Sequence, residues 1–399
     1  MAIDMNKLSE SKVMRDPLHH YIQVESSLIW DLINAKEFQR LRRIHQLSGA
    51  YLVFHTAEHS RFGHCLGVYE IIRRMVNEVN DLKQQLSEEE QLLVMVAGLL
   101  HDIGHGPFSH AFEAVATNSH EAMTKQLILE ESEINRILKA YDSDLPNQIA
   151  AIIDHSHPNK LLIQLISSQL DADRMDYLLR DSYFTGAKYG EFDLERILRT
   201  LKVVDNQLVV KESGIHTVED YIMSRYHMYW QVYYHATIRS FEAILVLLFQ
   251  RLRDLDLKDK YPMFAGLYQG QKLTNQQHFQ LDDYNCFYGF SQMCEDEDPI
   301  LCDLAERLVN RRLFSYQSVD AGSRTSDFFH LASGLDPRYY LYIDSASQVP
   351  YLPYLSQAEN VIKVLLKSGE IVELSEVSKI VKAMVSGENK EDYKLFYPQ

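Results

Sequence analysis

Histidine and aspartate residues are concentrated in and after the segment HDIGHGPFSH, which begins at residue 101. Four of the 17 His of the chain lie close together, at His101, His105, His110 and His120. A histidine that only satisfies a core helix end is usually isolated, whereas clustered imidazoles and carboxylates bind divalent cations or transfer protons. The cluster therefore favours a site that does chemistry over a set of structural histidines.

The adjacent pair His101-Asp102 stands at the end of an expected helix. Ser87 and Glu90 have the spacing of a capping box, which predicts that a helix begins after Ser87. A long apolar run follows, and the Gly-Pro segment 104–107 prevents the helix from continuing. Side chains of adjacent residues diverge by about 100° in mid-helix. A bend at the helix end lets both face one cation.

A second source of carboxylates is the segment LLIQLISSQLDADRMDYLLRDSYF. Its apolar spacing predicts one amphipathic helix whose apolar face is interrupted by Asp173 and Asp181. A buried carboxylate needs a metal, an Arg or a helix cap, because an unpaired buried charge is costly. We interpret Asp176 and Arg180 as a surface ion pair four residues apart, and Asp171 as a solvated charge.

Two His and two Asp would give a cation four nitrogen and oxygen ligands and leave room for water and a substrate oxygen, as hydrolysis requires. One zinc, iron, manganese, nickel or magnesium ion fits such a set. The phosphate-loop, dinucleotide-binding and nucleophile-elbow motifs are absent from the sequence. A zinc-protease motif could begin at His120, but its second histidine is replaced by Thr124.

The composition describes an ordinary globular protein of 399 residues, 46% hydrophobic and 24% charged, with a net charge of −16. This charge argues against strong binding to duplex nucleic acid or to an anionic membrane. The four scattered Cys fit reduced thiols, and the longest apolar run, Leu92 to Leu100, is far shorter than the ~20 residues of a membrane span. We expect a cytoplasmic protein that does not bind membranes.

The pattern predicts a mainly α fold in three parts. Residues 1–250 read as a helical core, interrupted by a short hairpin near 201–213 at the turn Asp205-Asn206. Residues 251–325 read as a helical and irregular extension with loops at DLDLKDK and CEDEDP. Residues 326–399 read as a small α+β element: RYYLYI and VIKVLLKSGEIVEL as strands, and SEVSKIVKAM as a helix with Ser375 as its N-cap.

Three segments in order, RFGHCLGV, HDIGHGPFSH and LDADRMDYLLRD, resemble the HD-domain phosphohydrolase superfamily. With EFQRLRRIHQLSGAYLVF and RYHMYWQVYYH, the resemblance narrows to the deoxynucleoside triphosphate triphosphohydrolases, which include bacterial dGTPase-like enzymes and the HD part of the mammalian SAM-and-HD-domain protein. It covers roughly residues 12 to 250. It implies an HD-type helical core that hydrolyses deoxynucleoside triphosphates (dNTPs) to deoxynucleoside and inorganic triphosphate.

The resemblance also assigns roles to individual residues. The implied metal ligands are His64, His101, Asp102 and Asp173. The implied catalytic and phosphate-contacting histidines are His105, His110 and His120, with Glu113 supporting His110, which would protonate the leaving 5′-oxygen or assist attack on the α-phosphorus. The implied substrate contacts are Gln46 and Leu47 at the sugar, Arg61, Arg174 and Arg225 at the phosphates, and Tyr177, Asp181 and Tyr233 around the ribose.

These roles are physically reasonable, because a triphosphate of charge about −4 in an acidic protein needs concentrated cations. Arg174 stands where relatives often carry Lys, which keeps the charge but changes the geometry of the donors. Taken alone, however, each of the three arginines also fits a solvated charge, and Tyr233 also fits core packing.

Relatives are commonly tetramers or larger oligomers that a bound nucleotide activates. The resemblance places that activator, with an accompanying magnesium ion, near Lys12, Val13, Asn34, Gln39 and Arg42. Asn34 departs from the guanine-reading pattern, since some relatives place an acid there. Two alternatives to a dNTP triphosphohydrolase remain open: an HD-type nucleotidase or phosphodiesterase acting on a monophosphate or cyclic nucleotide, and a protein that senses nucleotides or binds single-stranded nucleic acid.

Overall fold

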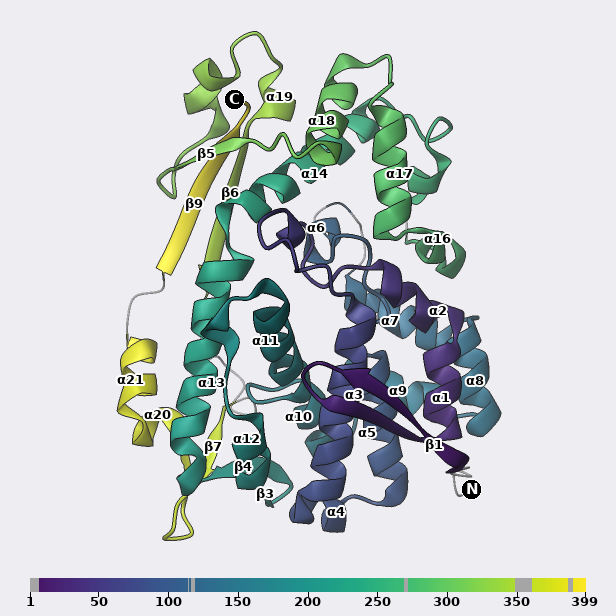
Figure 1. Ribbon diagram of the computed structural model, residues 1–399, viewed down its shortest axis with the longest axis vertical. Coiled ribbons are helices and arrows are strands. Elements are labelled where there is room, and N and C mark those ends of the chain that lie inside the picture. The colour runs from purple at the N-terminus through teal and green to yellow at the C-terminus, as the bar shows by residue number, and fades with distance from the viewer. Residues whose placement is uncertain (1–6, 114, 116–118, 269–271, 349–360, 387–389) are drawn as a thin grey trace.

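A computed structural model describes residues 7–113, 115, 119–268, 272–348, 361–386 and 390–399. Most of these residues are helical, and the strands form three small sheets (Figure 1), which confirms the mainly α prediction. Most of the buried apolar side chains form one large cluster that includes residues from Ile22 to Phe396, and Ala50, Ala57 and Ile238 form a small second one. The division of the chain at residues 250 and 325 stays a prediction.

The core helices pack around α3 and α5 in the lower part of Figure 1. The helices up to residue 254 are α1 (Ser27–Asn34), α2 (Lys36–Arg40), α3 (Arg61–Glu78), α4 (Asn80–Gln85), α5 (Glu88–Leu100), α6 (His110–Glu113), α7 (His120–Leu129), α8 (Glu133–Tyr141), α9 (Leu145–Ile153), α10 (Lys160–Ile166), α11 (Ala172–Thr185), α12 (Leu194–Thr200), α13 (Ile215–Met228) and α14 (Ala236–Asp254).

Helix α5 confirms the predicted capping box. The Ser87 hydroxyl accepts a hydrogen bond from the Glu90 amide at 3.1 Å, and the Glu90 carboxylate accepts one from the Ser87 amide at 3.0 Å. Its last turn is capped by His101, as predicted. The buried helix α5 thus ends at Leu100, and His101 and Asp102 lie in the turn that follows it.

The segment predicted as one amphipathic helix is two helices, α10 and α11, so that prediction was wrong. The break covers residues 167–171, and Asp171 is the N-cap of α11, accepting from the Arg174 amide at 2.7 Å. Aspartate favours a cap because its carboxylate satisfies an otherwise unpaired helix amide. The break places Asp173 in the first turn of α11 rather than in mid-helix.

The first residues that the structure describes form a hairpin that was not predicted from the sequence. Strands β1 (Lys7–Asp16) and β2 (His20–Ser26) pair antiparallel around the turn 17–19, and His20, at the start of β2, has a positive φ of 60°. Strand β2 contacts α1 and α3, and in Figure 1 the hairpin lies in front of these helices. Only Ile22 and Val24 of β2 are buried, so its apolar pattern is weak.

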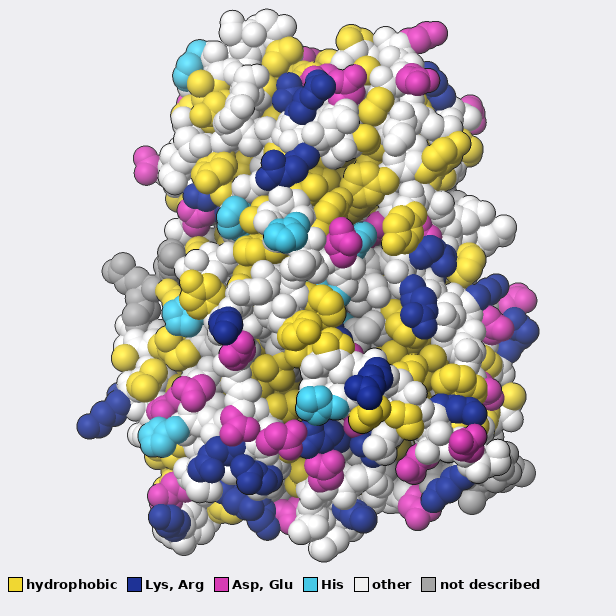
Figure 2. Space-filling view, in the orientation of Figure 1, with side chains coloured by type: hydrophobic (Ala, Val, Ile, Leu, Met, Phe, Trp, Pro, Cys, Tyr) yellow, Lys and Arg dark blue, Asp and Glu magenta, His cyan; other side chains and the backbone are white. Residues whose placement is uncertain are grey.

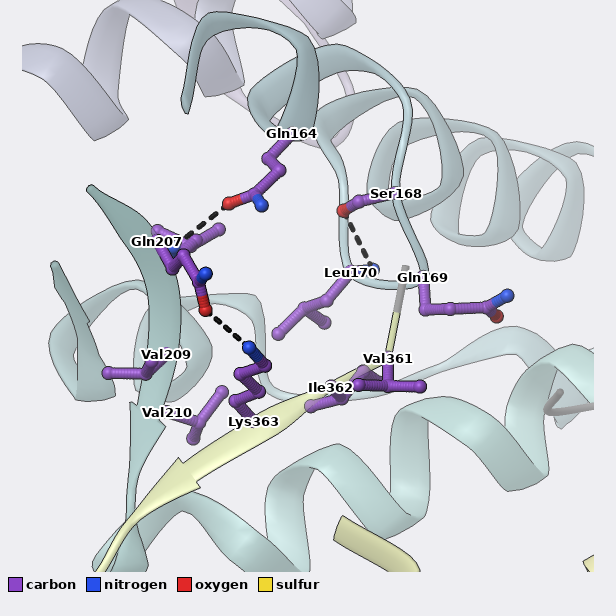
Figure 3. A pocket seen from close by; sticks show the side chains of 11 residues that line it. Gln164, Ser168, Gln169, Leu170, Gln207, Val209, Val210, Val361, Ile362 and Lys363 are labelled. Carbon is purple, nitrogen blue, oxygen red and sulfur yellow. Dashed lines mark hydrogen bonds between the residues drawn. The ribbon is translucent and has the colours of Figure 1, made fainter. Parts of the chain in front are cut away.

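The predicted hairpin at Asp205-Asn206 is confirmed. Strands β3 (Leu201–Val204) and β4 (Gln207–Lys211) are joined by these two residues, whose φ values of 50° and 58° suit a tight two-residue turn. Strands β7 (Lys363–Leu365) and β8 (Ile371–Glu373) extend the sheet in the order β3-β4-β7-β8. Figure 3 shows a small cavity of about 30 Å³ between this sheet and α10, where Gln164 accepts from the Leu208 amide.

Beyond residue 254 the chain is more helical than its irregular sequence suggested. The remaining helices are α15 (Ala265–Tyr268), α16 (Asn275–Gln280), α17 (Asp283–Met293), α18 (Pro299–Val309), α19 (Pro337–Tyr340), α20 (Leu374–Val377) and α21 (Lys379–Ser386). Strands β5 (Ser315–Ser318), β9 (Lys390–Tyr397) and β6 (Tyr342–Gln348) form a three-stranded sheet in that order. Helix α14 contacts both α18 and this sheet.

Two predictions in the C-terminal part were wrong in detail. RYYLYI is not all strand: its first three residues belong to α19, because Asp336 caps that helix, and β6 begins at Tyr342. SEVSKIVKAM is two short helices, and the cap of the first is Glu373 rather than Ser375. The predicted loops at DLDLKDK, after α14, and at CEDEDP, after α17, and the hairpin over Ser368-Gly369 are confirmed.

Among the described residues, no single helix is long and apolar enough to cross a membrane. One pair passes such a test together, Glu212–Tyr233 with Ala236–Asp254, but it is bent by 57°. The four cysteines are free thiols. On the face shown in Figure 2, basic and acidic side chains are interspersed.

Candidate active site

One cavity of about 590 Å³ brings together residues from distant parts of the sequence. Its wall includes α3, the loop at 46–50, α11, the start of α14 and strand β6. A π-helical turn, Tyr229–Tyr233, joins α13 to α14 and adds two aromatic residues to the wall. Ser48 and Ser109, also on the wall, have positive φ values of 42° and 52°, a strain that is frequent at functional sites.

A compact group of potential metal ligands, His64, His101 and Asp173, lies at this cavity. Nε2 of His64 is 3.1 Å from Asp173 and 3.8 Å from Asp102, and Nε2 of His101 is 3.4 Å from Asp102 and 3.6 Å from Asp173. The four implied ligands are therefore brought together by α3, α5 and α11. The spacing of residues 64, 101, 102 and 173 in the sequence does not by itself show that their side chains lie close together in space.

The arrangement of the two imidazoles fits a cation. Nδ1 of His101 bonds the Gly98 carbonyl at 2.8 Å and Nδ1 of His64 bonds Asp176 at 2.9 Å, so both Nε2 atoms face the carboxylates. Nε2 of His101 is buried and has no hydrogen-bond partner among the described residues. A divalent ion would satisfy this orphaned atom together with His64 Nε2 and the carboxylates.

The pKa shifts of His64 and Asp102 also favour a cation at this position. Burial alone would lower the pKa of His64, but hydrogen bonds to Asp173 and Asp176 raise it to about 10. Burial would raise the pKa of Asp102, but the neighbouring His101 imidazole, the Arg61 guanidinium and a hydrogen bond with His105 hold it well below its usual range. A site that holds a proton so firmly on an imidazole carries excess negative charge, which a cation would neutralise.

Asp176 and Arg180 are buried, so their interpretation as a surface pair was wrong. Arg180 makes two hydrogen bonds to Asp176, at 2.8 and 2.9 Å, and a third to Asp16 at 2.9 Å. Asp176 also lies 2.7 Å from Nε2 of His19. Together these residues support His64 from behind, and the contacts of Asp16 and His19 explain why the N-terminal hairpin packs here.

Asp171 is also buried, so its interpretation as a solvated charge was wrong. Besides capping α11, it forms an ion pair with Arg174. Arg174 lines the cavity and donates to the Ser168 carbonyl at 2.5 Å, while its buried Nε has no partner among the described residues. Asp171 thus orients the guanidinium of Arg174 on the cavity wall.

His105, His120 and Arg61 lie beside the candidate metal ligands on the cavity wall. The His105 and His120 rings stack with centroids 3.9 Å apart, and Arg61 pairs with Asp102 and donates to the Ser109 hydroxyl at 3.1 Å. Burial and the charge of Arg61 lower the pKa of His105 well below its ordinary value, so this imidazole stays neutral. His110 and Glu113 bound the short helix α6, and their side chains lie outside the described residues.

The residues assigned to the sugar also meet at the wall. Burial raises the pKa of Tyr233 well above its ordinary value, so its phenol stays protonated and donates to Asp181 at 2.8 Å. The rings of Tyr177 and Tyr233 are in edge contact at 6.2 Å. Gln46 and Leu47 line the same region, and the buried Oε1 of Gln46 has no partner among the described residues.

The other assigned residues lie apart from this wall. Arg225 is buried and donates to Gln169 at 3.0 Å instead of lining the cavity. In the implied activator segment, Lys12 and Val13 lie on β1, Asn34 bonds the Trp30 carbonyl, and Arg42 bonds Gln39 at 2.9 Å.

Several wall and support residues were missed by sequence reasoning. His59 bonds the second oxygen of Asp181 at 2.8 Å, and Ser48, Arg239, Glu242 and Asp344 line the cavity. The spacing of these residues in the sequence gives no sign that they belong to the site. Ser48 and His59 come from loops, Asp344 from strand β6, and Arg239 and Glu242 from α14, all outside the segments that carry the histidine motifs.

Comparison with known proteins agrees with this geometry. The HD domain family model matches residues 61–181, and the model of the HD associated region matches residues 192–330. The chain is 47% identical to the uncharacterised protein YwfO of Bacillus subtilis, over 100% of this chain and 95% of that one. It is 31% identical to the Dictyostelium discoideum homologue of deoxynucleoside triphosphate triphosphohydrolase SAMHD1, over 61% of this chain and 49% of that one.

Among solved structures, a phosphohydrolase from Bacteroides thetaiotaomicron superposes with a TM-score of 0.87 at 28% identity, covering 98% of this chain and 100% of that one. A helical HD core with clustered His and Asp side chains thus defines the class of the protein. The chain belongs to the HD-domain phosphohydrolase family.

Proposed function

We propose that the protein hydrolyses dNTPs to deoxynucleoside and inorganic triphosphate with one divalent or transition metal ion. The observation that carries this proposal is the order of groups along one cavity. His64 and Asp173 share the cavity wall with arginine and histidine side chains. The Tyr177 ring lies 6.5 Å from the His64 ring and 6.2 Å from the ring of Tyr233, which bonds Asp181, so the Asp181 and Tyr233 pair comes next along the wall. A nucleotide presents phosphates and then sugar in the same order. The name of the Dictyostelium relative supports the same substrate class.

The residues of the chain would divide the work as follows. Arg61 and Arg174 place positive charge at the phosphates, where charge-assisted hydrogen bonds are strong. Neutral His105, stacked on His120, offers a proton acceptor or donor beside them. From the family resemblance, His110 would donate a proton to the leaving 5′-oxygen. A metal ion at His64, His101, Asp102 and Asp173, when bound, would polarise a phosphoryl oxygen as a Lewis acid.

At the sugar, Asp181 and Gln46 offer acceptors to the deoxyribose 3′-hydroxyl, and the Tyr177 ring packs against the ring face. An aromatic side chain in that position leaves no space for a 2′-hydroxyl, which favours deoxynucleotides. We also infer from the family resemblance that the protein is a cytoplasmic homotetramer activated by a nucleotide, with magnesium, at the segment of Lys12, Val13, Asn34, Gln39 and Arg42.

The test is to incubate metal-replete protein with the four dNTPs, singly and mixed, and to resolve triphosphate from monophosphate, diphosphate and phosphate. We expect triphosphate and deoxynucleoside as the products, and faster release in the mixture if a nucleotide activates. Asp173→Asn should abolish release and bound metal together, whereas Asp220→Asn, an exposed carboxylate on α13, should change neither.

Cleavage of monophosphates or cyclic nucleotides without any triphosphate would reject the substrate and favour the nucleotidase or phosphodiesterase alternative. Size-exclusion chromatography with and without the nucleotide mixture tests the tetramer.

A further inference from the structure

The cavity continues past Tyr233 to a region lined by carboxylates. Glu242 lies six residues after the start of α14, about 9 Å along the helix axis from Ala236 at 1.5 Å per residue. Asp344 reaches the same cavity from strand β6, which runs beside α14 (Figure 1). Ser48 completes this end from the loop that also carries Gln46 and Leu47.

Asp344 is held in place by a buried arginine. Arg239 is 3% exposed; its Nε donates to Oδ2 of Asp344 at 2.6 Å, and Nη1 donates to Asp392 on β9 at 2.5 Å. Nη2 donates to the backbone carbonyls of both aspartates, at 3.1 and 3.2 Å. Arg239 thus clamps two strands of the C-terminal sheet to α14. The Asp344 side chain remains 33% exposed on the cavity wall.

Glu242 is a half-buried carboxyl on the same wall. Burial raises its pKa to about 7, and the charge of Asp344 acts in the same direction, while Ser48 and Arg239 act against both. A carboxyl removed from water in this way gains free energy when a ligand offers it a hydrogen-bond donor. Two carboxyls on one wall therefore suit a ligand edge that carries N–H groups.

We propose that this end of the cavity holds the nucleobase, and that Glu242 and Asp344 select bases that carry an exocyclic amino group. This inference rests on the proposed dNTP hydrolysis. At a pH well above its pKa of about 7, Glu242 is ionised and only accepts hydrogen bonds. Cytosine offers N4–H donors where thymine and uracil present the O4 acceptor. An acceptor placed against a carboxylate leaves both groups unpaired, which lowers binding in the transition state.

The sharpest comparison is between dCTP and dUTP, because these nucleotides share sugar and phosphates and differ on the edge at position 4 and N3. Full-length, metal-replete protein, at a pH well above the Glu242 pKa of about 7, is given equal concentrations of both together with the other dNTPs. The ratio of deoxycytidine to deoxyuridine released early in the reaction equals the ratio of their kcat/KM values. For the native chain we expect this ratio to exceed about ten.

Glu242→Gln places an amide donor where a carboxyl stood, so it should lower the ratio at least about five-fold while triphosphate is still released. Asp344→Asn should act in the same direction. Asp392→Asn weakens the same Arg239 clamp without lining the cavity, and it should leave the ratio unchanged. This control separates base reading from a general loosening of the sheet.

A native ratio near one, or unchanged ratios in both Glu242→Gln and Asp344→Asn, would overturn the base-reading role and leave the proposed hydrolysis standing. A change in Asp392→Asn as large as that in Asp344→Asn, with none in Glu242→Gln, would also overturn it. The absence of triphosphate from every nucleotide would instead reject the proposed function, and this inference with it.

Discussion

Asp176 connects the candidate metal cluster to the N-terminal hairpin. Its carboxylate fixes the ring of His64 through Nδ1, so that Nε2 faces Asp173. Outer carboxylates of this kind set the tautomer and raise the basicity of a metal-binding imidazole, and their loss typically costs 10- to 100-fold in metal affinity. We expect Asp176→Asn to lower metal affinity by about that factor, measured as metal retained per chain across a chelator series.

The matched control for this prediction is Asp16→Asn. Asp16 pairs with Arg180 at 2.9 Å, as Asp176 does, but it does not bond His64. Asp16→Asn should therefore retain metal like the native chain, even where unfolding curves show reduced stability. Equal metal loss in both variants would mean that the Arg180 network acts only through general stability.

For individual residues, the sequence predicted the type of chemistry better than it predicted which side chains are buried and what they contact. The clustered histidines and the resemblance pointed to the four residues that meet at the cavity. Asp171 and Asp176 were misjudged because helical spacing does not show which side of a short helix faces the core. His59 and Asp344 were missed because each reaches the site from outside the matched motifs.

At the scale of elements, helix α3 approaches α11 closely at Gly67. A Cβ at this position would overlap the Asp176 carboxylate and lie 2.5 Å from Nη2 of Arg180. Gly67→Ala should therefore displace the buried network, lower stability by about 1–3 kcal/mol, and weaken metal binding together with it. The measurements are urea unfolding followed by circular dichroism and the same chelator series.

Gly63→Ala is the control on the same helix. Its nearest neighbour, Nη1 of Arg180, would be 3.6 Å from the added carbon, an ordinary contact. Alanine has the higher helix propensity, so this variant should be neutral or more stable by up to about 1 kcal/mol. A Gly67→Ala protein as stable as Gly63→Ala would show that the helices separate without cost.

Elements with strong local signals were predicted well. The capping box at Ser87, the turn at Asp205-Asn206 and the hairpin over Ser368-Gly369 each depend on neighbouring residues, and the structure contains all three. The division of α10 from α11 depends on the tertiary placement of Asp171, and hairpin β1–β2 buries few apolar residues. Neither feature leaves a periodic pattern that a reader of the sequence could recognise.

At the scale of the whole molecule, the cavity needs parts of the chain far outside the histidine motifs. Strand β6 supplies Asp344, and Arg239 binds that strand to α14. The extension contributes to the site through Asp283, a fully buried residue in the first turn of α17. The segments after residue 254 therefore shape the site, a role that their irregular sequence gave no reason to expect.

Asp283 offers a direct test of this dependence. One carboxylate oxygen accepts from the Phe108 amide at 2.9 Å, and the other accepts from the His45 amide at 2.7 Å, so a residue of the extension fixes both loops that carry Ser109 and Gln46 to the cavity. In Asp283→Asn one of these buried amides faces an N–H group instead of an acceptor, which costs about 1–3 kcal/mol. Small displacements of positioning groups also reduce turnover steeply.

We expect Asp283→Asn to lower kcat for triphosphate release about ten- to hundred-fold, with bound metal retained, because the hydrogen bonds of Asp283 go to His45 and Phe108 and not to a candidate metal ligand. Its neighbour Asp282 caps α17 and pairs with Arg43 at 2.5 Å but bonds neither loop. Since asparagine is also a good cap, Asp282→Asn should keep nearly native turnover. Native kcat in Asp283→Asn would mean that the two loops hold their positions without the extension.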